Sequence, residues 1–125
     1  MIDHISVGVS HLERSAAFYE ATLAALGLTR LVTRPRTVGF GKAYPEFWIN
    51  LREAMPRVLP ESGVHICLRV KTTAEVDAFH AAALATGGAS DGAPGIRPHD
   101  RVRYYAAFVL DPDGNRIEAV TFPQE

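Results

Sequence analysis

Two stretches of the chain, HISVGV from position 4 and HICLRV from position 65, open with the same two residues and share a strand-like apolar pattern. The likeness continues without a gap through the next 18 positions, and a glycine, Gly27 or Gly88, closes each copy. Chance matches between apolar residues are common, but a shared opening histidine and a shared closing glycine are not. Internal repeats indicate one supersecondary unit used twice. The sequence therefore predicts a duplicated module.

The composition favours one globular domain. The chain has 125 residues, 47% of them hydrophobic, and a net charge of −1. That balance gives no basic surface for nucleic acid and no reason to bind an anionic membrane. The one cysteine cannot form an internal disulfide, and no secretory signal is evident, so we expect a cytoplasmic protein. We expect a single domain over residues 1–125, with module one at 1–52, a linker at 53–62 and module two at 63–123.

Each copy begins as a strand followed by a helix. HISVGV alternates polar and apolar residues, which is the period of a half-buried strand. Ser10 and Glu13 in the first copy, and Thr72 and Glu75 in the second, have the spacing of a helical capping box. Both copies are therefore expected to carry a helix directly after the histidine strand.

The remainder of each copy is strand-like. In the first, the expected strands are 28–32, 37–40 and 47–51; in the second they are 103–110 and 116–122, joined by a DPDG turn. The segment GGASDGAPGIRPHD is rich in glycine and proline and is interpreted mostly as a long loop, with room for one short strand. The fold class expected is α+β, with two tandem βαβββ modules.

The paired histidine strands, the paired helices and the terminal run YYAAFVLDPDGNRIEAV resemble the vicinal oxygen chelate superfamily. This superfamily includes glyoxalase I, fosfomycin-resistance transferases, extradiol dioxygenases and bleomycin-resistance proteins. The resemblance covers nearly the whole chain. It implies that the modules curl into a cup-shaped mixed sheet with the helices on the outer face.

The resemblance also implies a metal site. With the apolar strand residues facing the helices, His4, His65 and Glu118 would face the concavity, since side chains alternate along a strand. At the family's ligand positions these three would hold a divalent metal, which can be Fe, Mn, Ni, Co or Zn. The alternative stays open that Glu118 pairs with a protonated histidine and no metal binds.

Asn50 departs from the glyoxalase I pattern, in which a carboxylate on the last strand of module one is a fourth ligand. Aligning FWINL with RIEAV places Asn50 where Glu118 stands in module two. An amide binds metal weakly, so a three-ligand site like that of the dioxygenases and fosfomycin transferases is expected instead.

Aromatic and basic residues on the same strands suit a small, partly apolar, anionic or enolisable substrate. The residues expected to contact it are Trp48, Asn50, Arg103, Tyr104 and Tyr105, although only one of the two adjacent tyrosines can face the cup and the rings can equally be core. His99, in a loop, is the candidate general base. Cys67 lacks a positioned base and is not expected to be a nucleophile.

Three functions remain open. The first is a metal-dependent lyase, isomerase or ring-cleaving oxygenase acting on a small molecule that the metal chelates. The second is a non-catalytic binder of the bleomycin-resistance type, and the third is a thiol transferase of the fosfomycin-resistance type. A homodimer is expected from the family's habits. If its two chains exchange modules, the His4 and His65 of one site belong to different chains.

Overall fold

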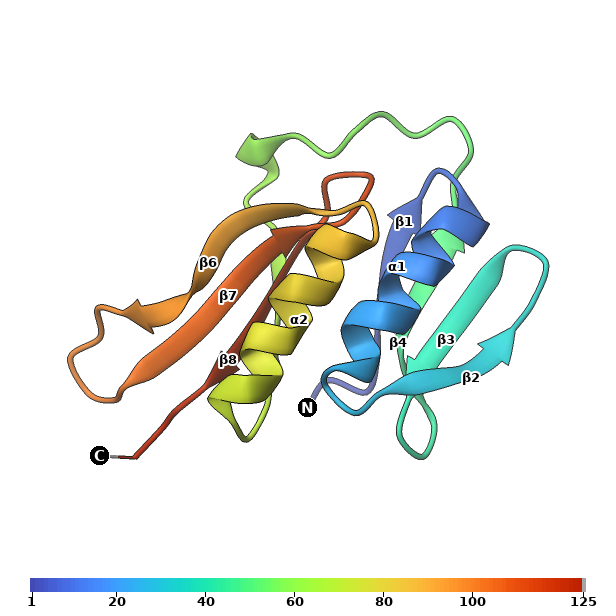
Figure 1. Ribbon diagram of the computed structural model, residues 1–125. Helices are drawn as coiled ribbons and strands as arrows, with labels where there is room; N and C mark the ends of the chain where they lie inside the picture. Colours follow the sequence, from blue (N-terminus) through green and yellow to red (C-terminus); the bar gives the residue numbers. More distant parts are fainter. Residues whose placement is uncertain (125) are drawn as a thin grey trace.

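The computed structural model describes residues 1–124 and contains two tandem βαβββ modules (Figure 1). Module one comprises β1 (Ile5–Val9), α1 (Leu12–Ala24), β2 (Thr29–Thr33), β3 (Thr37–Gly41) and β4 (Pro45–Leu51). Module two comprises β5 (His65–Arg69), α2 (Thr73–Ala85), β6 (Ala89–Arg97), β7 (Tyr104–Leu110) and β8 (Arg116–Thr121). A linker containing the short 3₁₀ helix η1 (Pro60–Ser62) joins them. The predicted α+β duplication is confirmed.

The strands form two four-stranded mixed sheets, with the orders β1-β4-β3-β2 and β5-β8-β7-β6. In each module the histidine strand pairs in parallel with the last strand, while the remaining pairs are antiparallel. The mixed sheet expected from the resemblance thus consists of two four-stranded halves, one from each module. Over residues 1–124, β1 and β5 are edge strands with a hydrogen-bonded neighbour on one side only. A groove of about 420 Å³ lies between them, lined by residues 2–5, Glu46 and residues 65–68.

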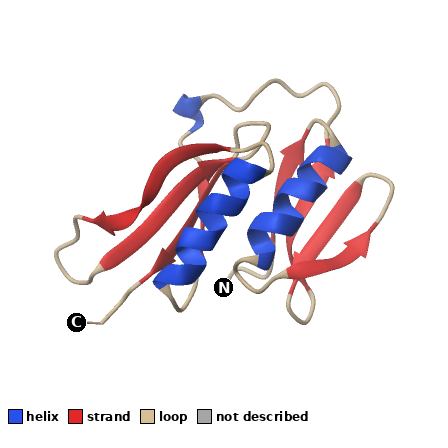
Figure 2. Ribbon diagram, viewed as in Figure 1, coloured by secondary structure: helices blue, strands red, loops and turns tan. Residues whose placement is uncertain are grey.

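Both helices lie side by side on the same side of the molecule, each packed on its own sheet (Figures 1 and 2). Alternation along the strands explains this arrangement, because apolar residues point to the helices and polar ones to the opposite face. Side chains of both modules meet in one core, which includes Phe18, Tyr19, Phe47, Phe79 and Ile117. No helix within residues 1–124 has the length and apolar character to span a membrane.

The turn DPDGN (residues 111–115) reverses the chain between β7 and β8, and its side chains also hydrogen-bond to module one. Tyr19 donates a hydrogen bond to Asp111, and the amide of Asn115 donates to the carbonyl of Gly8 at 2.9 Å. These contacts join positions 92 and 107 residues apart. The motif that carries the family resemblance thus fastens the two modules together.

The two helices begin differently, although the sequence predicted a capping box in each. In α2 the box is confirmed, since Thr72 Oγ1 accepts from the Glu75 backbone at 3.2 Å and the Glu75 carboxylate accepts from the Thr72 backbone at 3.1 Å. In α1 no side chain caps the helix locally, and the predicted box of Ser10 and Glu13 is wrong. The backbone N–H of Ser10 instead donates to Asp113 of the DPDGN turn at 2.9 Å.

The segment interpreted mostly as a loop contains the longest strand, β6. Its pairing with β7 shifts register between Ser90 and Gly92 and again between Gly92 and Gly95. An edge strand tolerates such bulges, and it tolerates Pro94 because alternate backbone N–H groups of an edge strand face away from the sheet and need no acceptor strand. Glycine and proline here mark an irregular edge strand, not the absence of one.

Candidate functional site

Glu118 is a buried carboxylate at the centre of the second sheet. It lies on β8 between Cys67 of β5 and Phe108 of β7, and its exposure is 1%. Its neighbours Ile117 and Ala119 are buried in the core below the sheet, so alternation directs Glu118 to the opposite, polar face. A buried charge of this kind requires partners that compensate for lost hydration.

Both oxygens of Glu118 have such a partner. His65 Nε2 lies 3.1 Å from Oε1, and the hydroxyl of Tyr104 donates to Oε2. His65 opens β5 and its side chain is half exposed, so one side of this pair is open to solvent. An imidazole nitrogen and a carboxylate oxygen at this distance can ligate one divalent metal ion. Without a metal, the imidazole N–H can donate a hydrogen bond to the carboxylate oxygen.

His4 is placed apart from this pair. It precedes β1, its side chain is 55% exposed, and its Nδ1 lies 2.7 Å from the carboxylate of Asp3. His4 and His65 lie on opposite sides of the groove between the two sheets. Within residues 1–124 of one chain, no three His, Cys, Asp or Glu side chains are close enough to hold a metal. The expected convergence of His4 with His65 and Glu118 is therefore not found inside a single chain.

The polar face of the first sheet carries two of the predicted substrate-binding residues. Trp48 and Asn50 line a shallow cavity of about 250 Å³ together with His4, Ser6, Arg34 and Thr37. The guanidinium of Arg34 lies 5.4 Å from the centre of the Trp48 ring, which is a cation–π arrangement. The amide of Asn50 donates to the hydroxyl of Ser6 on β1. Asn50 thus makes a hydrogen bond within the sheet, to the neighbouring strand β1.

The two adjacent tyrosines face opposite sides of the second sheet. Tyr104 lies on the face of Glu118. Tyr105 donates to Asp77 of α2 at 2.6 Å, so it belongs to the helix side, and its predicted contact with substrate is wrong for this arrangement of the chain. Strand alternation required that one of them be turned away, but periodicity alone did not identify which one.

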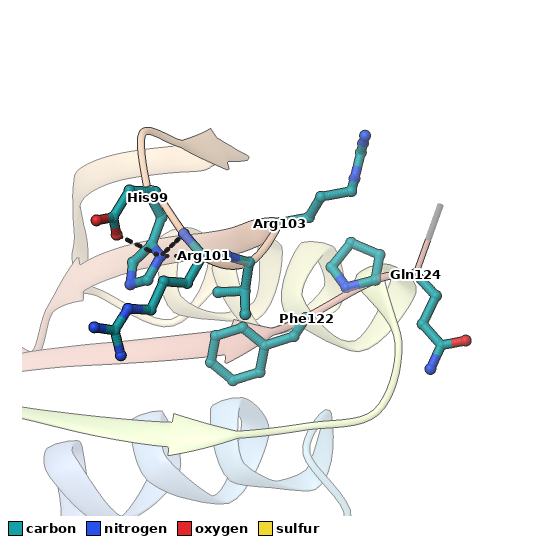
Figure 3. Close-up of a pocket in the computed structure, with 8 residues that line it drawn as sticks. His99, Arg101, Arg103, Phe122 and Gln124 are labelled. Carbon is teal, nitrogen blue, oxygen red and sulfur yellow. Dashed lines mark hydrogen bonds and ion pairs between the residues drawn. The ribbon is translucent and has the colours of Figure 1, made fainter.

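A second cavity, of about 460 Å³, lies beside the start of β7 and the end of β8 (Figure 3). It is lined by His99, Asp100, Arg101, Val102, Arg103, Phe122, Pro123 and Gln124. The side chain of Arg103 points away from His99 and Phe122 in this view. Arg103 therefore borders the cavity without reaching towards the aromatic rings.

His99 is held by its own loop. Its Nδ1 accepts hydrogen bonds from the backbone N–H groups of Arg101 at 3.1 Å and Val102 at 3.4 Å. A neutral imidazole that accepts at Nδ1 carries its proton on Nε2. Neutral His99 therefore presents an N–H donor, which weakens the predicted role as a general base. Its ring stacks on Tyr104, with 5.9 Å between centres and 10° between planes.

Two arginines that the sequence analysis did not select lie over aromatic rings of this face. Arg69 lies 4.7 Å from the centre of Phe122, and Arg97 lies 5.6 Å from that of Phe108. Arg69 shares the strand parity of His65, so alternation along HICLR was a usable signal. Arg97 falls in the segment interpreted mostly as a loop, where no parity was assigned.

Burial and the carboxylate alter the acidity of two neighbours of Glu118. Burial, then the negative charge of Glu118, raises the pKa of the Cys67 thiol to about 12. Burial, then the hydrogen bond to Glu118, also raises the pKa of Tyr104. Both groups therefore stay protonated near neutral pH. The Cys67 thiol is a poor nucleophile, in agreement with the expectation from sequence.

The chain matches the family model of the Glyoxalase/Bleomycin resistance protein/Dioxygenase superfamily over residues 1–119. No curated protein matches it. Among solved structures, it is similar to a glyoxalase/bleomycin resistance protein from Albidiferax ferrireducens T118, with 32% identity, a TM-score of 0.84, and 95% of this chain and 97% of that chain covered.

Two further solved structures share the fold at lower identity. A glyoxalase/bleomycin resistance protein/dioxygenase family enzyme from Burkholderia phytofirmans PsJN is 17% identical, with a TM-score of 0.72 and 98% of each chain covered. A lactoylglutathione lyase from Agrobacterium tumefaciens is 19% identical, with a TM-score of 0.67 and 97% of this chain and 92% of that chain covered. These likenesses concern the architecture alone.

Proposed function

Because this chain belongs to the Glyoxalase/Bleomycin resistance protein/Dioxygenase superfamily, we propose that it is a metal-dependent enzyme acting on a small, oxygen-rich molecule. The reaction would be that of a lyase, an isomerase or a ring-cleaving oxygenase. The observation that carries the proposal is the buried Glu118 carboxylate 3.1 Å from the half-exposed His65 imidazole. A buried carboxylate beside a half-exposed imidazole offers one oxygen and one nitrogen donor on the side open to solvent, which suits a cation site.

The metal would be Fe(II), Mn(II), Ni(II), Co(II) or Zn(II), held by His65 and Glu118 with His4 as third ligand. Since one chain does not bring His4 to the other two, we propose that His4 comes from a second copy in a homodimer. The unpaired edge strands β1 and β5 leave the modules free to associate between chains as well as within one. When bound, the metal would act as a Lewis acid on substrate oxygens.

The remaining residues would bind and orient the substrate. Tyr104, Phe108 and Phe122 offer an aromatic surface around Glu118, and Arg69 adds positive charge beside it. In an exchanged dimer, the first-sheet residues Trp48 and Asn50 would close the opposite wall. Such a site suits a planar molecule with anionic or enolic oxygens.

A second candidate function is non-catalytic binding of a small molecule. Both oxygens of Glu118 already have protein partners, one from His65 and one from Tyr104, so the cluster is satisfied without a metal. In that case the two faces would form a binding cleft only. Metal content separates the two functions.

The first experiment measures divalent metal by mass spectrometry in tag-free protein, wild type and the variants His4→Ala, His65→Ala and Glu118→Ala, each checked for folding. Metal in the wild type and its loss in every folded variant supports the enzyme. A wild type that stays metal-free after exposure to all five ions contradicts it and favours the binder.

The dimer is tested by complementation. His4→Ala and Glu118→Ala chains are produced separately and together, and the heterodimer is purified with two tags. In an exchanged dimer, one of the two sites combines the intact His4 of one chain with the intact His65 and Glu118 of the other. Metal binding should therefore return in the heterodimer, whereas sites formed within one chain would remain defective in both.

A further inference from the structure

We propose that Tyr104 is a positioning residue that holds one oxygen of Glu118 and leaves the other to face the metal together with His65. This inference rests on the proposed function, since it concerns how the same site is prepared for its ion. It differs from the sequence-based expectation, in which Tyr104 contacts substrate directly.

The two carboxylate oxygens of Glu118 have different partners. The Tyr104 hydroxyl donates to Oε2, while Oε1 lies 3.1 Å from Nε2 of His65. The carboxylate is 1% exposed, so water does not compete for Oε2. Hydrogen bonds to a ligating carboxylate fix its orientation and are a large part of a metal site's affinity. With Oε2 engaged by Tyr104, Glu118 is oriented to bind through Oε1 alone.

The ring of Tyr104 is itself fixed on both sides. His99 stacks on it at 5.9 Å, and Phe122 meets it edge-to-face, with 5.6 Å between centres and 77° between planes. His99 is in turn held by backbone N–H groups of its loop. The hydroxyl therefore has little freedom to leave Glu118, and the loop that lines the cavity of Figure 3 supports the carboxylate through the Tyr104 ring.

Tyr105 provides a matched control. It is the next residue on β7, and its hydroxyl also donates to a carboxylate, that of Asp77 on α2, at 2.6 Å. This contact lies on the helix side of the sheet. Tyr104→Phe and Tyr105→Phe thus each delete one hydroxyl from one tyrosine–carboxylate pair, but only the first pair includes a proposed ligand.

The test is a Co(II) titration of metal-free full-length protein, wild type and both variants, by calorimetry and visible absorption. We expect Tyr104→Phe to bind Co(II) about tenfold more weakly or worse, because Glu118 loses the hydrogen bond that orients it. The absorption spectrum should also change, because the freed carboxylate can turn and ligate through both oxygens. Tyr105→Phe should keep wild-type affinity and spectrum. Equal affinity and spectrum in Tyr104→Phe and wild type would overturn the inference.

A measurement on the wild type alone keeps the inference testable if Tyr104→Phe does not fold. Infrared difference spectra of protein labelled with ¹³C at its glutamate carboxyls, recorded before and after adding Co(II), report the separation between the two carboxylate stretches. A wide separation, indicating one-oxygen ligation, is expected, and a narrow one contradicts the inference. A wild type that binds no Co(II) removes the proposed function as well, whereas binding without the Tyr104 effect removes only this inference.

Discussion

The hydroxyl of Tyr19 on α1 donates a hydrogen bond of 2.6 Å to Oδ2 of Asp111, 92 residues further along the chain. Both side chains are buried, at 0% and 1% exposure. The contact joins a helix of module one to the DPDGN turn of module two. It explains why aspartate and asparagine stand in a turn that glycine and proline alone could have formed: their side chains bind the other module.

Removal of this hydroxyl in Tyr19→Phe should destabilise the protein by about 1–3 kcal/mol, because a buried carboxylate oxygen loses one of its donors. Urea denaturation followed by circular dichroism measures the free energy of unfolding. Tyr44→Phe, at an exposed tyrosine, is the control and should leave that free energy unchanged. Equal stability of Tyr19→Phe and wild type would contradict a role for the hydrogen bond.

The same tyrosine should make the fold sensitive to alkali. Burial first, and then the negative charge of Asp111, raises the pKa of Tyr19 well above 10. Above about pH 10 the unfolded chain releases this proton while the folded protein retains it. The free energy of unfolding should therefore fall as pH rises beyond that value. Denaturation series between about pH 8 and 11 should show that the free energy of unfolding falls less steeply in Tyr19→Phe than in wild type, because the variant lacks the Tyr19 contribution. Some fall should remain, because the other tyrosines titrate in both proteins.

Asp113 should stabilise the start of α1 from the opposite module. It accepts from the backbone of Ser10 at 2.9 Å and lies 3.4 Å from Arg14. Because Asp113 is buried, loss of its contacts with Ser10 in Asp113→Ala should lower the free energy of unfolding by about 1–3 kcal/mol. Asp100→Ala, whose carboxylate is 90% exposed, is the matched control. A loss of the same size in both variants would argue against a role for the Asp113 contacts.

Gly39 should determine where the single tryptophan lies. A Cβ atom at Gly39 would stand 2.9 Å from Cζ3 of Trp48 and 3.0 Å from Cβ of Pro45, closer than these atoms tolerate. Gly39→Ala should therefore displace the indole and change its fluorescence maximum, which is easily assigned because the chain has one tryptophan. Gly95→Ala, on the other sheet and near only a flexible arginine, should leave the spectrum unaltered.

Cys67 should react slowly with alkylating reagents, although the residue is exposed. Partial burial of its sulfur and the charge of Glu118 raise the pKa of the thiol to about 12, so almost none of it is ionised at neutral pH. In chelator-treated protein, iodoacetamide should modify Cys67 more slowly than it modifies free cysteine. Glu118→Gln removes the negative charge and should accelerate the reaction. A rate unaffected by that substitution would mean that burial alone suppresses the thiolate.

Periodicity and turn chemistry predicted most of the fold. The alternation in HISVGV and RIEAV placed the right residues towards the helices, and Thr72 with Glu75 marked the start of α2 correctly. Ser10 and Glu13 gave the same local signal, yet no local side chain caps α1, and the Ser10 backbone N–H donates to Asp113 instead. A contact 103 residues away leaves no trace in a local pattern. The length of β6 was underestimated for another reason, since an edge strand can carry the glycine and proline that a central strand cannot.

The candidate site was predicted less completely. Strand parity correctly directed His65 and Glu118 to one face, where they meet. Parity says which face a residue occupies but not how two sheets are set against each other, so the position of His4 did not follow from it. Parity also could not say which of Tyr104 and Tyr105 faces Glu118, because that depends on the side of the sheet on which α2 packs.

The two polar faces of this duplicated fold are no longer copies of each other. The first presents Trp48, Arg34 and Asn50, whereas the second presents the buried Glu118 with His65 and Tyr104. In the proposed site, the first face would supply the recognition surface and the second the charged cluster. A substitution at Trp48 or Arg34 would then alter ligand preference while the contacts of Glu118 with His65 and Tyr104 stay unchanged.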